Sequence, residues 1–298
     1  MKQIVDSAEV GEGFDRIRDS HIGMTPRRYD NFGWQHGAVP QALHIHRYGP
    51  PGPFRILAIH GLGGHGQRWR TLATQHLPDL PVAAPDLIGH GQSTYSAPWT
   101  IDSNVAALAD LVANESDGPV LVVGHSFGGA IALNLAAAHP DLVSGLVLLD
   151  PAIGLDGEWM RQIAQASAAS PDYADREEAR TEKINGSWAD VPVADLDDDL
   201  DQHLLPLPNG RYGWRVFGPA IMSYWSELAR EIVFPRNGIP TTLVLATLTQ
   251  PPYVGTELIE GLSERLGADF TLVNLDCRHM VSQARPADTA AIIRTMLG

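Results

Sequence analysis

Apolar and polar positions follow two kinds of pattern from about residue 27 onward. Short runs rich in Val, Leu and Ile alternate with longer stretches of helical pattern. Short continuous apolar runs are typical of strands that are buried on both faces of a sheet. The alternation predicts an α/β fold, in which a mostly parallel sheet is covered by helices. The expected strands are 42–48, 54–59, 81–84, 119–123, 145–149, 241–247 and 270–275, with helices over 102–114, 128–138 and 286–297.

The alternation stops between residues 151 and 236. Residues 171–201 hold eleven Asp and Glu against three Lys and Arg. Four of the seven tryptophans lie between residues 151 and 236. A segment that is acidic outside and aromatic inside predicts an inserted helical cap over a pocket, with Trp159 and Trp225 as pocket residues. The alternative is that these aromatics form the insertion's own small core. The predicted domains are an N-terminal segment 1–26, a core of 27–150 and 237–298, and a cap 151–236.

Charge and cysteine content narrow the function classes. The chain has 298 residues and a net charge of −14, which disfavours binding to nucleic acid or to anionic lipid and favours a small neutral substrate. No stretch approaches the roughly 20 apolar residues of a membrane span, and the first residues lack the apolar run of a secretion signal. Cys277 is the single cysteine, so no intrachain disulfide can form. We therefore expect a cytoplasmic protein, monomeric or homodimeric.

The strongest chemical signal is the segment PVLVVGHSFGGAIALNLAAAHP at residues 119–140. An apolar strand runs into Gly124-His125-Ser126-Phe127-Gly128, and an alanine-rich and leucine-rich helix follows. This strand, turn and helix are the context of a nucleophile elbow, where flanking glycines avoid collisions at a strained turn. Ser126 is the predicted nucleophile. The alternative is a glycine-rich turn with an incidental serine.

A second glycine-rich loop follows the strand at 54–59 and reads HGLGG at residues 60–64. Such a loop can turn a backbone N–H toward the oxyanion that forms when a serine attacks a carbonyl. The predicted oxyanion donors are the N–H groups of Leu62 and Phe127. The pattern G-x-x-x-x-G-K-[ST] is absent, and the match of residues 61–66 (GLGGHG) to G-x-G-x-x-G is on its own a weak signal, so we discount a nucleotide.

Four segments in this order resemble the landmarks of the α/β-hydrolase superfamily. They are HGLGG, APDLIGHGQS at 84–93, GHSFGG at 124–129 and RHMVSQARP at 278–286. The resemblance covers most of the chain from about residue 27. It implies an eight-stranded, mostly parallel sheet, a structural role for the loop from Asp86 to Gly91, and His279 as the catalytic histidine. A serine needs such a base because its own hydroxyl is a poor nucleophile.

The third member of the catalytic triad is the least obvious residue. In most α/β hydrolases the acid follows the strand after the lid, but here that strand is followed by Thr249 and Gln250. The preceding strand ends in Asp150, at the superfamily's alternative acid position, and Asp150 is the predicted acid. An aspartate at this point is also common as a purely structural residue. The remaining candidates are Glu257 and Asp276.

These residues together predict a carboxylesterase-like serine hydrolase that cleaves a small acyl ester through an acyl-enzyme, with no cofactor and no metal. No H-E-x-x-H or comparable histidine cluster indicates a metal site, and Cys277 is expected to fill space rather than react. The same triad would serve a carbon–carbon bond hydrolase, a thioesterase, a lactonase or a cofactor-free haloperoxidase. A ligand receptor with the hydrolase fold and little turnover is the alternative from another class.

Overall fold

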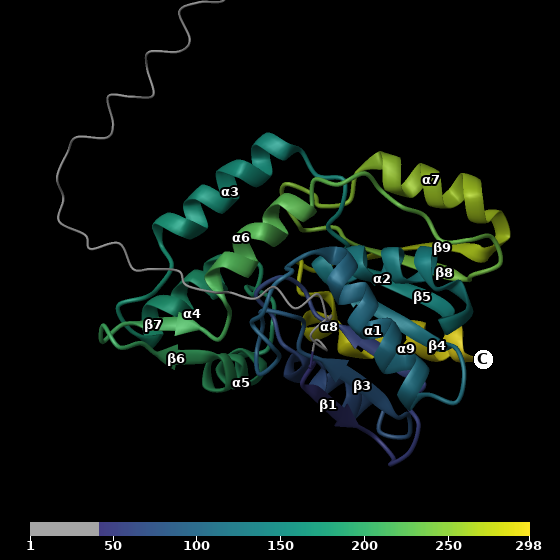
Figure 1. Ribbon diagram of the computed structural model, residues 1–298, viewed down its shortest axis with the longest axis horizontal. Helices are drawn as coiled ribbons and strands as arrows, with labels where there is room; N and C mark the ends of the chain where they lie inside the picture. The colour runs from purple at the N-terminus through teal and green to yellow at the C-terminus, as the bar shows by residue number, and fades with distance from the viewer. Residues whose placement is uncertain (1–41) are drawn as a thin grey trace, which may run out of the picture. The chain divides into compact units, whose positions relative to one another are not determined.

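The computed structural model describes residues 42–298. Its main sheet has seven strands in the order β1-β3-β2-β4-β5-β8-β9 (Figure 1). Strand β1 is antiparallel to β3, and the other neighbouring pairs are parallel. The strands are β1 (Ile45–Tyr48), β2 (Ile56–Ile59), β3 (Val82–Pro85), β4 (Val120–His125), β5 (Val143–Leu149), β8 (Thr241–Ala246) and β9 (Phe270–Leu275).

All seven strands expected from the apolar runs are confirmed. The eight strands implied by the resemblance are not all found in residues 42–298, because this part of the chain contains seven apolar runs of strand type and each forms one strand of the sheet. The predicted N-terminal segment 1–26 lies outside the described residues.

Side chains of the central strands alternate between two apolar cores. In β4, Val120 and Val122 pack on one face of the sheet, whereas Leu121 and Val123 pack on the other. Helices α1 (Ile101–Glu115), α2 (Phe127–Ala138) and α7 (Thr256–Leu266) cover the first face, and η2 (Gly66–Trp69), η3 (Leu72–His76), α8 (Val281–Ala284) and α9 (Pro286–Leu297) cover the second. Because both faces are covered, the central strands read as continuous apolar runs. The helices expected over 102–114, 128–138 and 286–297 are confirmed as α1, α2 and α9.

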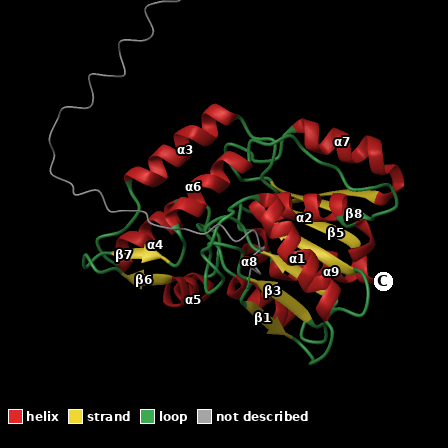
Figure 2. Ribbon diagram, in the orientation of Figure 1, coloured by secondary structure: helices red, strands yellow, loops and turns green. Residues whose placement is uncertain are grey.

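Between β5 and β8 the chain forms helices and a small two-stranded antiparallel sheet (Figure 2). Trp188 and Trp214 belong to a separate apolar cluster, which residues of this segment form together with Met280. Trp159 and Trp225 instead pack against the main core. The elements are α3 (Gly157–Ala169), α4 (Arg176–Asn185), α5 (Val193–His203), β6 (Leu204–Pro206), β7 (Tyr212–Trp214) and α6 (Gly218–Glu227). Two short 3₁₀ turns outside this segment, η4 (Pro140–Leu142) and η5 (Gly267–Asp269), precede β5 and β9.

Buried polar contacts join the insertion to the core. The side chain of Glu227 accepts a 2.7 Å hydrogen bond from the N–H of Ile101 at the start of α1. The buried carboxylate of Asp199 in α5 contacts Arg68, outside the insertion, at 2.7 Å, and Lys183 of α4 contacts the same carboxylate at 2.7 Å. Residues 40–298 accordingly form one compact unit. Within the described residues, no helix is both long enough and apolar enough to cross a bilayer.

Candidate active site

Ser126 lies in a strained turn between β4 and α2. Its backbone has φ of 54° and ψ of −120°, a conformation that side chains rarely adopt. A Cβ on Gly124 would lie 2.4 Å from the carbonyl oxygen of Gly128, and one on Gly128 would lie 2.3 Å from that of Ile59. Both flanking positions therefore require glycine, as the elbow interpretation predicts. Ser126 directly precedes the first residue of α2, where the helix dipole favours negative charge.

Asp150 and His279 are brought together from segments 129 residues apart. Oδ2 of Asp150 accepts a hydrogen bond of 2.6 Å from Nδ1 of His279. Asp150 is 3% exposed and the side chain of His279 is 12% exposed, so this contact is shielded from solvent. With Nδ1 carrying the proton, Nε2 of His279 keeps a lone pair that can accept one. In the described part of the chain no hydrogen bond joins Ser126 to His279, and such bonds are often long before substrate binds.

Two further donors hold the carboxylate of Asp150. The hydroxyl of Thr249 donates to Oδ2 at 3.2 Å, and the N–H of Ala246 donates to Oδ1 at 3.3 Å. Thr249 stands at the position where most α/β hydrolases carry the acid, and here its hydroxyl donates to Asp150, the predicted acid that follows β5. The other two candidates are exposed, and Asp276 accepts a 2.7 Å hydrogen bond from Thr247 rather than from His279.

Aromatic side chains enclose the imidazole of His279. The ring centroid of Tyr253 lies 4.4 Å from that of His279, and the ring of His125 lies 4.7 Å away. Nε2 of His125 also hydrogen-bonds to the backbone oxygen of His279 at 2.7 Å. Trp159 stacks on Tyr253 with a centroid distance of 5.7 Å. Tyr253 was not anticipated, because its contact with His279 depends on the loop that follows β8 and not on a local motif.

Two neutral histidines hold the loop predicted to supply an oxyanion donor. Nδ1 of His60 donates to the oxygen of Gly61 at 2.7 Å, while Nε2 accepts from the N–H of Leu87 at 3.0 Å. Nε2 of His90 accepts from the N–H of Gly63 at 3.1 Å. A Cβ on Gly61 would lie 3.0 Å from Cβ of Ser126, so the loop passes directly against the serine.

The predicted oxyanion donors flank that serine. Leu62 follows Gly61 in the loop, and Phe127 is the first residue of α2. The first N–H groups of a helix have no acceptor within the helix, so the N–H of Phe127 is available to bind an oxyanion. We keep both residues as the proposed donors.

A sequence profile of the Alpha/beta hydrolase family matches residues 56–292. The chain belongs to this family. Lipase LipV of Mycobacterium tuberculosis is 59% identical over 256 residues, which cover 86% of this chain and 98% of the lipase. A pimeloyl-[acyl-carrier protein] methyl ester esterase of Neisseria meningitidis is 39% identical over 94 residues, which cover 32% of this chain and 35% of the esterase.

Solved structures share the fold of this α/β hydrolase. An E-2-(acetamidomethylene)succinate hydrolase superposes with a TM-score of 0.72 at 20% identity, covering 86% of this chain and 94% of that one. A marine microorganism esterase superposes with a TM-score of 0.69 at 21% identity, covering 86% and 99% of the two chains. At these identities the likeness concerns the fold alone.

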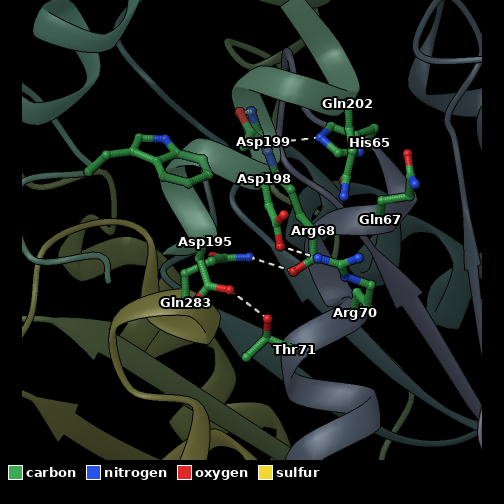
Figure 3. Close-up of a pocket in the computed structure, with 11 residues that line it drawn as sticks. His65, Gln67, Arg68, Arg70, Thr71, Asp195, Asp198, Asp199, Gln202 and Gln283 are labelled. Atoms are coloured by element: carbon green, nitrogen blue, oxygen red, sulfur yellow. Dashed lines mark hydrogen bonds and ion pairs between the residues drawn. The ribbon is translucent and has the colours of Figure 1, made fainter. Parts of the chain in front are cut away.

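Three further residues, Cys277, His65 and Trp225, lie in places that give them no contact with the predicted triad residues among the hydrogen bonds and ring contacts of the described chain. Cys277 is buried, and burial raises the pKa of its thiol to about 12, which suppresses the reactive thiolate. Nε2 of His65, which follows the HGLGG loop, contacts the carboxylate of Asp199 at 2.9 Å. Figure 3 shows the polar pocket between η2 and α5 that includes this contact, and none of the three predicted triad residues lines it. For Trp225, the buried indole Nε1 has no protein partner in the described residues.

Five buried histidines make the fold sensitive to acid. Burial is the largest cause that lowers the pKa of each below the ordinary 6.5, to about 4 for His90. The folded chain therefore keeps them neutral at a pH where the unfolded chain protonates them, so stability falls as pH drops below 6.5. From pH 7.5 to 5.5 we expect the free energy of unfolding to fall, by about 1.4 kcal/mol for His90, whose pKa is lowered to about 4, with further losses in the same direction from the other four. The five are His60, His65, His90, His125 and His203.

Urea unfolding at the two pH values measures this loss. His203→Phe should reduce the pH dependence by about one proton, because Nε2 of His203 has no partner to lose among the described residues and the ring stacks on His65. His139→Gln is the control, since His139 is exposed. Equal unfolding free energies at pH 7.5 and 5.5 would contradict the prediction.

Proposed function

We propose that this protein is a serine hydrolase that cleaves esters through an acyl-enzyme intermediate, with Ser126 as nucleophile, His279 as base and Asp150 as acid. The observation that carries the proposal is the 2.6 Å hydrogen bond from Nδ1 of His279 to the buried Asp150. It leaves Nε2 as the basic nitrogen of the imidazole. The strained elbow at Ser126 and the similarity to a lipase over most of the chain support it.

In the first half-reaction Oγ of Ser126 attacks the ester carbonyl carbon while Nε2 of His279 takes the hydroxyl proton. The N–H groups of Leu62 and Phe127 stabilise the negative charge on the carbonyl oxygen. The imidazolium of His279 then gives its proton to the alcohol oxygen, and the C–O bond breaks. Water repeats the sequence, releasing the carboxylic acid and restoring the hydroxyl of Ser126.

Asp150 serves this chemistry by orientation and charge. Its carboxylate accepts Nδ1–H of His279 and so selects the tautomer with a basic Nε2. Burial strengthens its attraction to the imidazolium that forms in the transition state. Tyr253 and His125 pack beside the same ring and limit its rotation.

Residues 151–236 are the proposed cap over the acyl site, and residues 27–150 with 237–298 are the proposed core. Support comes from the stack of Trp159 in α3 on Tyr253, which itself contacts His279. An aromatic wall at this point suits the apolar acyl chain of an ester. The single buried Cys277 supports a reducing compartment, and we propose the cytoplasm.

The decisive experiment combines covalent labelling with a substrate panel. A fluorophosphonate should label the purified protein at Ser126, and p-nitrophenyl esters should be hydrolysed with multiple turnovers. Thioesters, lactones and ring-cleavage diketones complete the panel. Absence of labelling would overturn the proposal, labelling without turnover would favour the receptor alternative, and a strong preference for a diketone would assign the carbon–carbon hydrolase reaction.

Removing the indole of Trp159 should alter acyl-chain preference more than stability. Trp159→Ala takes one aromatic ring from the wall beside Tyr253, while Trp159 itself is only partly buried. We expect the ratio of kcat/KM between hexanoyl and acetyl esters to fall several-fold, since each buried methylene contributes about 0.8 kcal/mol. Trp188→Phe, within the insertion's own cluster, is the matched control. An unchanged ester ranking accompanied by a lower melting temperature would show that Trp159 is only a core residue.

A further inference from the structure

Two histidines and one aspartate outside the proposed triad converge where β1 meets the end of β3. His44 and His46 are two residues apart in an extended segment, so their side chains lie on the same face. His46 pairs with Ala84 in the antiparallel register, and the N–H of Asp86 donates to the oxygen of His44 at 2.8 Å. Each of the three offers one ligand atom, and these atoms all lie within 4.8 Å of one another.

The carboxylate of Asp86 is held in place by backbone donors. Oδ1 accepts the N–H of Gly66 at 2.7 Å, and Oδ2 accepts the N–H of Gln92 at 2.8 Å. A Cβ on Gly91 would lie 2.1 Å from Oδ2, so the carboxylate fits closely against this glycine. Asp86 is 1% exposed, yet its Oδ1 also contacts His46. Such outer contacts orient a ligand and raise the affinity of a metal site.

The two imidazoles complete the donor set. Nε2 of His46 lies 3.2 Å from Oδ1 of Asp86, and Nε2 of His44 lies 3.3 Å from the side-chain nitrogen of Gln92. Two atoms bound to one tetrahedral ion at about 2.1 Å are themselves roughly 3.4 Å apart, close to the His46–Asp86 separation. His44 is only half-buried, so its ring can turn toward the other two ligands and an ion can enter from solvent.

We propose that His44, His46 and Asp86 form a binding site for a divalent transition-metal ion of the Zn²⁺ or Cu²⁺ type. Two imidazole nitrogens and one carboxylate suit these ions, whereas Ca²⁺ and Mg²⁺ prefer oxygen ligands alone. Three protein ligands leave a fourth position for water. The sequence shows no sign of this cluster, because strand pairing and not a local motif brings the three residues together.

Binding at this site would reinforce the loop that faces the active centre. Asp86 begins the segment whose Leu87 N–H and His90 side chain hold residues 60–63. An ion that joins Asp86 to β1 therefore stabilises the folded chain without contacting Ser126 or His279. The site is distinct from the proposed triad and does not depend on the proposed function.

The test uses the full chain without an affinity tag, treated with EDTA and then dialysed free of chelator. Calorimetric titration with ZnCl₂ should show one ion per chain and a raised melting temperature. Cu²⁺ should give an electron paramagnetic resonance spectrum with nitrogen coupling. His44→Gln and His46→Gln should each weaken binding at least tenfold. His139→Gln and His279→Ala should bind as the unaltered chain does, which separates this site from surface and active-site histidines.

Two results would overturn the proposal. One is a Kd for Zn²⁺ weaker than about 100 μM in the unaltered chain. With such a Kd, micromolar Zn²⁺ would add almost nothing to the stability of the folded chain. The other is equal binding by His44→Gln and the unaltered chain. Because His44 is half-buried and its variant leaves the His46–Asp86 contact in place, circular dichroism should show an unchanged fold in that variant.

Discussion

Ser126→Ala should remove nearly all ester hydrolysis, with a loss in kcat on the order of 10⁵-fold or more. The reason is that alanine lacks the attacking oxygen, and neither His279 nor the oxyanion donors can replace it. The backbone at residue 126 keeps its φ of 54°, and alanine keeps the Cβ of serine, so the strain at the turn is unchanged. We therefore expect the melting temperature to stay within a few degrees of the original.

His279→Ala provides the matched comparison. It should lower kcat by a similar factor, and the double variant with Ser126→Ala should be scarcely slower than either single variant, because the members of one catalytic unit act together. Steady-state rates with p-nitrophenyl acetate and circular dichroism measure both effects. Activity of Ser126→Ala within a few-fold of the original would refute the nucleophile assignment, and multiplying losses in the double variant would argue against a shared mechanism.

The main sheet could be predicted from the sequence because both of its faces are buried. The inner strands β2, β3, β4, β5 and β8 contain short apolar runs, whereas the edge strands β1 (IHRY) and β9 (FTLVNL) mix apolar and polar residues. The inner structure of residues 151–236 could not be predicted in the same way. Helices α4 and α5 are largely polar, and the hairpin of β6 and β7 contains only three residues in each strand. Such elements are selected by tertiary packing more than by local pattern.

The candidate site was predictable where a residue lies at the end of an element. Ser126 follows β4 and Asp150 follows β5, and both positions show in the sequence. Contacts that depend on pairing between distant segments were not visible. Thr249 on Asp150, Tyr253 on His279 and Asp199 on Arg68 span 99, 26 and 131 residues. The burial of Asp199 against Arg68 and Lys183 could not be predicted, because Asp199 lies within a run of acidic residues that is typical of a solvent-exposed face.

Asp150→Asn should preserve the fold and lower kcat by about 10⁴-fold, because the amide selects the wrong tautomer of His279. The carboxylate now accepts three hydrogen bonds, from Ala246 N–H at Oδ1 and from Thr249 and His279 at Oδ2. An asparagine must keep its oxygen toward the N–H of Ala246, which can only donate. Its NH₂ group then faces Nδ1 of His279, so the proton moves to Nε2 and the base is lost.

The fold should tolerate this substitution. Asp150 has φ of 44°, a left-handed conformation that asparagine adopts as readily as aspartate. The hydroxyl of Thr249 can rotate to accept from the amide, so no buried group at this position loses its partner. The melting temperature of Asp150→Asn should therefore remain close to the original, and the low activity would not come from unfolding.

Glu257→Gln and Asp276→Asn are the controls, because both carboxylates are exposed and neither contacts His279 in the described structure. Each should retain activity within about two-fold of the original. Each of the three variants replaces one carboxylate with an amide. A loss of activity in Asp150→Asn alone therefore points to the carboxylate beside Nδ1 of His279. If Asp150→Asn stays active while one of the controls is inactive, that control marks the true acid, and the hydrogen bond at 2.6 Å is structural.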